Sequence, residues 1–215
     1  MLKISIDNVI REAKKFQNKN DFESATKIYN SYLKSYPKNI RIANMLQDVK
    51  KQKLKQELNE FNELFQSKIY LKAEKIGDEL YKTFKNNIEF LRLYGTLKAN
   101  LNKLNEAKEI FLILLSIEPK TYMTLNNLGN ICYLENDFDQ ATYYFKKSLK
   151  ENKNFPGVQN GLGLIFLQKK DFHKAIEKFN EYVKLVPDDE SGYINLGNCY
   201  KELEEYDEAI SYYNN

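Results

Sequence analysis

The sequence contains no tryptophan, two cysteines, four prolines, one histidine and only eight glycines in 215 residues. So few glycines and prolines exclude a collagen, a flexible linker and an all-β fold built on many tight turns. No apolar run is long enough to span a bilayer, so we expect no membrane insertion. The first residues have neither the apolar run nor the cleavage site of a secretory signal, so we expect a cytoplasmic protein.

The residue types that carry most enzyme chemistry are scarce. His173 is the single histidine and no nucleophile elbow accompanies it, which argues against a Ser-His-Asp or Cys-His catalytic group. No Cys-x-x-Cys or His-x-x-x-His spacing occurs, so we predict no metal site and no cofactor. The string Gly161-Leu162-Gly163 lacks the preceding strand and the third glycine or lysine of a phosphate-binding loop. We therefore expect the chain not to be an enzyme.

The charge is small in total but unevenly distributed. The net charge is +3, yet residues 1–53 carry +7, residues 54–189 carry +1 and residues 190–215 carry −5. The small total gives no field that would attract nucleic acid, and the cluster Lys50–Lys55 is short for a polyanion site. The opposed ends fit either two solvated surfaces or head-to-tail contacts between copies.

What the sequence does contain is a 34-residue repeat. A large residue followed by glycine recurs at 94–95, 128–129, 162–163 and 196–197. Later in each unit an alanine and an aromatic residue keep the same spacing, at Ala107, Ala141, Ala175 and Ala209 and at Phe111, Phe145, Phe179 and Tyr213. The small residues allow two helices to approach closely, and the large ones fill the space around them. A single unit cannot bury its apolar face alone, so the units are expected to stack.

This pattern, with Pro119 and Pro187 two periods apart, resembles the tetratricopeptide repeat family. The resemblance implies an all-α, right-handed superhelical solenoid of antiparallel helix pairs, with about six units in this chain. In the turns at 136–139, 170–173 and 205–207 we expect the aspartate, Asp207 in the last of them, to cap the second helix while the neighbouring aromatic residue packs inward. Cys132 and Cys199 fall in the cores of units two periods apart, so we expect buried thiols and no disulfide.

The repeat register also divides the chain. Units at 54–87, 88–121, 122–155, 156–189 and a truncated 190–215 form one predicted solenoid domain, 54–215. A further unit at 6–39 is separated from them by 14 additional residues, which predicts an N-terminal domain, 1–53, of one repeat and an extra helix. No proline or glycine interrupts 40–67, so this segment is either one helix of about 28 residues and roughly 40 Å, or includes a separate short helix.

The truncated last unit is expected to leave an apolar edge uncovered. The residues concerned are Ile194, Leu196, Tyr200, Ile210 and Tyr213. Such an edge favours contact with a neighbour, so homo-oligomers through this edge or through the 40–67 helix are one possibility that we keep open.

The resemblance implies a concave groove lined by the first helix of each unit. The residues at groove-facing positions are Arg92, Thr96, Asn126, Asn127, Asn130, Asn160, Asn195 and Asn198. Each asparagine offers a donor and an acceptor, so a column of them can hold the backbone of an extended peptide. This array resembles the asparagine ladder of the repeats in O-linked N-acetylglucosamine transferases. The family's carboxylate clamp is matched at Arg92 and Asn127, but Asn160 and Leu164 depart from it, which argues against a chaperone adaptor.

We therefore predict a non-catalytic protein–protein interaction scaffold that binds an extended peptide or a partner protein in the groove. Two alternatives stay open. The chain could be the substrate-recognition region of a larger glycosyltransferase or sulfotransferase, or a self-assembling structural module. Each reading has protein partners and none has nucleic acid.

Overall fold

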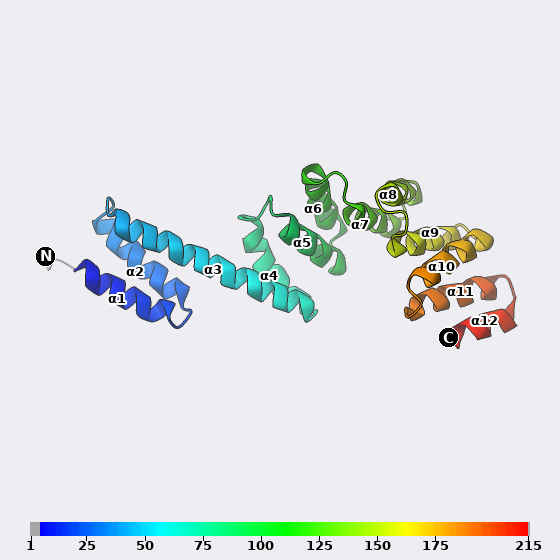
Figure 1. The fold of residues 1–215 in the computed structure, drawn as a ribbon, viewed down its shortest axis with the longest axis horizontal. Coiled ribbons are helices and arrows are strands. Elements are labelled where there is room, and N and C mark those ends of the chain that lie inside the picture. The colour runs from blue at the N-terminus through cyan, green and yellow to red at the C-terminus, as the bar shows by residue number, and fades with distance from the viewer. Residues whose placement is uncertain (1–4, 215) are drawn as a thin grey trace. The chain divides into compact units, whose positions relative to one another are not determined.

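The computed structural model describes residues 5–214, which form twelve helices and no β-strand. The helices are α1 (Ile6–Gln17), α2 (Phe22–Ser35), α3 (Ile40–Gln66), α4 (Tyr70–Tyr81), α5 (Ile88–Asn100), α6 (Leu104–Ile117), α7 (Tyr122–Leu134), α8 (Phe138–Glu151), α9 (Pro156–Gln168), α10 (Phe172–Leu185), α11 (Glu190–Glu202) and α12 (Tyr206–Tyr213). Successive helices pair as antiparallel hairpins (Figure 1). The predicted all-α solenoid of helix pairs is confirmed.

The chain divides into two compact units between Thr83 and Phe84. We call α1–α4 the N-terminal unit and α5–α12 the C-terminal unit. In the N-terminal unit α3 is one continuous helix of 27 residues, which decides between the two forms expected for 40–67. The predicted domain boundary between 53 and 54 therefore falls inside a helix, because nothing in this segment interrupts helix propagation.

The two halves of α3 pack against different partners. Ile42, Leu46 and Val49 of its first half join the core formed with α1 and α2. Phe61, in the second half, is fully buried, and α4 packs along α3. The single helix α3 thus contains both the 14-residue insertion and the first helix of the next repeat.

The turn inside each helix pair repeats with the sequence period. A residue with positive φ lies at Asn20, Lys68, Asn102, Asn136, Lys170 and Glu204, with φ between 58° and 62°. The last five positions are 34 residues apart, and Asn20 precedes Lys68 by one period plus the 14-residue insertion. The backbone of all six pairs therefore follows the register that the sequence predicted.

The expected close packing of glycines and aromatic rings is present in the C-terminal unit. A Cβ added to Gly95, Gly129, Gly163 or Gly197 would lie 2.4–2.8 Å from a ring atom of the aromatic residue 16 positions later. The alanines of the second helices at 107, 141, 175 and 209 are buried as well. These small residues let the two helices of each pair pack closely against each other.

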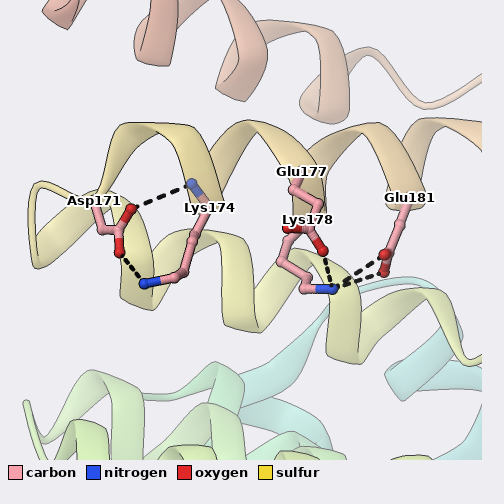
Figure 2. Close-up of polar contacts among 5 residues, drawn as sticks. All are labelled: Asp171, Lys174, Glu177, Lys178 and Glu181. Carbon is pink, nitrogen blue, oxygen red and sulfur yellow. Dashed lines mark hydrogen bonds and ion pairs between the residues drawn. The ribbon is translucent and has the colours of Figure 1, made fainter.

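The capping prediction holds for two of the three turns. Asp137 accepts a hydrogen bond from the Gln140 backbone amide at 3.0 Å. Asp171 accepts one from the Lys174 amide at 3.3 Å and a second from Lys174 Nζ at 2.6 Å, as Figure 2 shows. Further along the same face of α10, Lys178 bridges Glu177 and Glu181 (Figure 2).

The third turn is different. Asp207 lies in the first turn of α12, and the residue at the capping position is Glu205, whose side chain makes no capping bond. The prediction for Asp207 was wrong because residue 205, not 207, occupies the repeat position of Asp137 and Asp171. Tyr206 is 59% exposed rather than folded inward, whereas Phe138 and Phe172 are half-buried.

The predicted apolar edge is only partly exposed. Ile194, Ile210 and Tyr213 are exposed, but Leu196 is buried in the core and the ring of Tyr200 stacks on Tyr212 with centroids 5.2 Å apart. Both cysteines are buried and free, as expected. None of the helices within 5–214 is both long enough and apolar enough to cross a membrane.

Candidate functional site

A small hollow lies between α5 and α7 in the C-terminal unit. Its volume is about 210 Å³, and we call it the α5–α7 hollow. It is lined by Thr96, Ala99 and Asn100 of α5, by Phe111 of α6, and by Asn127, Asn130, Ile131 and Leu134 of α7. Three predicted groove residues, Thr96, Asn127 and Asn130, therefore meet in one place.

The two predicted asparagines of the hollow, Asn127 and Asn130, keep their hydrogen-bonding capacity open. Among the described residues, none hydrogen-bonds to the side chain of Asn127 or Asn130, whereas the Thr96 hydroxyl donates to the Arg92 carbonyl at 2.8 Å. Asn127 is half-buried and Asn130 is exposed. Each amide can donate two hydrogen bonds and accept two, so this pair is available to a ligand.

Asn160, Asn195 and Asn198 are engaged within the protein. The Asn195 amide nitrogen donates to Asn160 Oδ1 at 3.1 Å, which links α9 to α11. Asn198 Oδ1 accepts from the Tyr213 hydroxyl at 2.8 Å. These three residues contribute to packing between helices, and each retains only part of its capacity for a ligand.

Arg92 and Asn126 do not present free groups to a groove. Arg92 pairs with Glu118 at 3.3 Å, so its charge is already partnered. Asn126 is only 7% exposed, and its Oδ1 is buried without a hydrogen bond. Gly157 allows the start of α9 to cover it, since a Cβ there would lie 3.1 Å from that oxygen.

The hollow includes residues that were not predicted. Asn100 and Leu134 occupy one repeat position, 34 residues apart, and each lies one turn beyond Thr96 or Asn130. On a helix, residues i and i+4 share a face. The ninth residue of each repeat is one of the predicted groove positions, so the repeat pattern also indicated the thirteenth, where Asn100 and Leu134 lie.

The single histidine, His173, does not line the hollow. His173 is exposed at the start of α10. Within residues 5–214, no group of three or more histidine, cysteine, aspartate or glutamate side chains is placed to hold a metal ion.

Two family models match the chain, both described as tetratricopeptide repeat, over residues 123–155 and 191–215. These are two of the units that the 34-residue register defined, and the helix pairs have the expected packing. The chain therefore contains tetratricopeptide repeats. Tetratricopeptide repeats and their fold support a protein-interaction scaffold.

Curated relatives match parts of this chain. It is 32% identical to Protein O-mannosyl-transferase TMTC3 of Mus musculus over 77 residues, 36% of this chain and 8% of that protein. It is 30% identical to an uncharacterized helicase of Dictyostelium discoideum over 132 residues, 57% of this chain and 7% of that protein. The chain thus spans less than a tenth of the length of either relative.

Solved structures share the fold. A tetratricopeptide repeat protein from Parabacteroides merdae superposes with a TM-score of 0.65 at 16% identity, covering 96% of this chain and 76% of that one. The crystal structure of MamA protein superposes with a TM-score of 0.59 at 18% identity, covering 75% and 88%. At such identities the likeness concerns the fold alone.

Proposed function

We propose that this tetratricopeptide repeat protein binds an extended peptide segment of a partner protein, with Asn127 and Asn130 holding the peptide backbone. The observation that carries the proposal is the pair of unengaged amides beside the α5–α7 hollow. Weaker contacts are proposed from the first helices of the other repeats in the C-terminal unit. They are made by Thr96 and by the partly engaged amides of Asn160, Asn195 and Asn198. Arg92 and Asn126 support the site without contacting the peptide.

The chemistry of the pair suits a backbone ligand. An extended peptide presents a donor and an acceptor at every residue, and an asparagine amide matches both. Side chains three residues apart on a helix have Cβ atoms about 5–6 Å apart, so both amides can reach one peptide segment. Each such hydrogen bond contributes about 0.5–1.5 kcal/mol net, which makes two of them measurable.

The test uses the full chain and a phage-displayed library of random 12-residue peptides. Selected peptides are synthesised, and their affinity is measured by fluorescence anisotropy for the wild type and for Asn127→Ala/Asn130→Ala. We expect the double variant to bind at least tenfold more weakly, with an unfolding midpoint close to that of the wild type. The matched control is Asn105→Ala/Asn154→Ala, two exposed asparagines outside the hollow.

Two results contradict the proposal. One is a library that yields no peptide binding to the folded wild-type chain. The other is equal affinity of the selected peptides for the double variant and for the control.

A second candidate function is substrate recognition within a larger glycosyltransferase. The observation that favours it is the 32% identity to Protein O-mannosyl-transferase TMTC3 over 77 residues. Sequencing the gene on both sides of this chain tests it. A glycosyltransferase domain in the same reading frame supports this candidate, and its absence from the complete reading frame rejects it.

A further inference from the structure

We infer that the α5–α7 hollow is a subsite for one uncharged apolar side chain, of leucine to phenylalanine size, on the bound peptide. The inference rests on the proposed function and adds a rule of sequence selection to it. A ligand held only by backbone hydrogen bonds would carry no such rule.

The size of the hollow selects the class of occupant. Pockets for whole small molecules or cofactors measure about 300–1,000 Å³, and this hollow measures about 210 Å³. An apolar cavity of about 150 Å³ is enough to hold benzene. The hollow is therefore too small for a typical free ligand and large enough for one aliphatic or aromatic side chain.

The residues that line the hollow select its polarity. Four of the eight are apolar: Ala99, Phe111, Ile131 and Leu134. The other four, Thr96, Asn100, Asn127 and Asn130, are polar but uncharged, so no lining residue can neutralise an ionised side chain. Removing a charge from water without a partner is strongly unfavourable, whereas burying apolar area is favourable. An apolar side chain is thus accepted and a lysine or aspartate is rejected.

The polar residues of the hollow suit the peptide groups on either side of that side chain. Asn127 and Asn130 make no hydrogen bond within the described protein, so they can bond the backbone while the side chain enters the hollow. The next first helix offers a different environment, since Leu164 of α9 stands where α7 has Asn130 and α5 has Thr96. The α5–α7 hollow therefore combines an apolar lining with amides that are available to a ligand.

Two exposed leucines of the C-terminal unit give a matched pair of variants. Leu134 lines the hollow and is 56% exposed, while Leu112, on α6, is 44% exposed and lies outside it. Because both are exposed, Leu134→Ala and Leu112→Ala are expected to fold equally well. A third variant, Ala99→Phe, places a ring in the hollow itself.

The experiment selects peptides from the same random 12-residue library on the wild-type chain and measures their affinities for each variant. We expect the selected peptides to share one leucine, isoleucine, methionine or phenylalanine. Replacing that residue of the peptide by lysine or aspartate weakens binding at least tenfold. Leu134→Ala weakens binding about three- to tenfold, Leu112→Ala leaves it unchanged, and Ala99→Phe removes the preference for the apolar residue.

The outcomes separate this inference from the proposed function. If lysine or aspartate is tolerated at every peptide position while Asn127→Ala/Asn130→Ala still abolishes binding, the subsite is rejected and the peptide groove stands. Equal binding by Leu134→Ala and Leu112→Ala also rejects the subsite. If the library yields no peptide at all, both proposals fail. Should Ala99→Phe not fold, the peptide replacements decide, since they leave the protein unchanged.

Discussion

Gly129 lies against the ring of Phe145, so close that a Cβ on Gly129 would be 2.5 Å from Phe145 Cε1. Gly161 approaches the same ring from α9, and a Cβ there would be 2.4 Å from Phe145 Cζ. The ring is therefore held between two glycines of neighbouring first helices. It cannot move away from one without meeting the other.

Gly129→Ala is expected to destabilise the protein. The added methyl group has no space, and overpacking of this kind costs about 1–3 kcal/mol. Because Gly161 keeps the Phe145 ring from moving away, the overpacking cost lies in the upper part of that range, about 2–3 kcal/mol. The higher helix propensity of alanine returns about 1 kcal/mol, so the expected net loss is about 1–2 kcal/mol. The measurement is the urea unfolding midpoint. The neighbouring Asn130→Ala, at an exposed position, serves as control, and an equal or higher midpoint for Gly129→Ala contradicts the packing shown here.

Lys170→Gly is expected to stabilise the protein. Lys170 has φ of 59°, in the left-handed region that residues with a Cβ enter at a cost of about 1–2 kcal/mol and that glycine enters freely. The unfolded chain gains freedom with glycine, so the expected net gain is about 0.5–1 kcal/mol. Asparagine occupies the same repeat position at 136, and Asn136→Lys should change the unfolding midpoint in the opposite direction. A midpoint that falls for Lys170→Gly counts against this reading of the turn.

Cys199 and Cys132 are expected to be inert in the folded protein. Burial raises the pKa of the Cys199 thiol to about 11 and also raises the pKa of Cys132. At pH 8 the thiolate population of Cys199 is therefore about a hundredfold below that of a thiol with the ordinary pKa of 9.0. Ellman's reagent should give no rapid reaction with the native chain and two thiols per chain in denaturant. A rapid native reaction would show that the thiols are accessible.

The same shift makes stability depend on alkaline pH. The folded state holds the thiol proton more tightly than the unfolded state does. The contribution of Cys199 is therefore fully present below the unfolded pKa and decreases as pH rises towards about 11. Comparing unfolding midpoints at pH 8 and pH 10 for the wild type and Cys199→Ala measures it. The wild type should lose more stability over this interval, and equal losses contradict the assignment.

Asp137→Ala is expected to cost about 1 kcal/mol, because Asp137 satisfies the free Gln140 amide at the start of α8. Asp139, two residues later in the same turn of helix, is almost fully exposed and caps nothing. Asp139→Ala should therefore leave the thermal unfolding midpoint nearly unchanged, and equal effects of the two substitutions would falsify the capping role.

Much of the fold could be predicted because particular positions of the repeat require a small residue or an aromatic one. The glycine at 129 and the aromatic at 145 are 16 residues apart, which is the distance between facing positions of the two helices of a pair. The same spacing returns in four units of the sequence, and four glycine–aromatic contacts follow. The exception at Asp207 came from placing the cap two residues out of register, where the structure has Glu205.

The candidate site was less predictable. Asn126 and Asn160 occupy the same repeat position, 34 residues apart, yet Asn126 is covered at Gly157 whereas Asn160 bonds Asn195. Asn130 and Leu164 share another repeat position, and only Asn130 offers an amide there. Repeat position alone therefore does not predict which groove residues are open. Their exposure depends on the size of the residues on the neighbouring helix, which the spacing does not encode.

By itself the sequence, with no tryptophan, few glycines and a 34-residue period, determined the helix pairs, their turns and their tightest contacts. These depend on residues within one unit or at one fixed spacing. Only the tertiary structure decided that 40–66 is a single helix, that the chain divides after Thr83, and that Asn127 and Asn130 stay open beside a hollow. The physical reason is that helix continuation and side-chain exposure depend on contacts with neighbouring helices, and those contacts form only when the units stack.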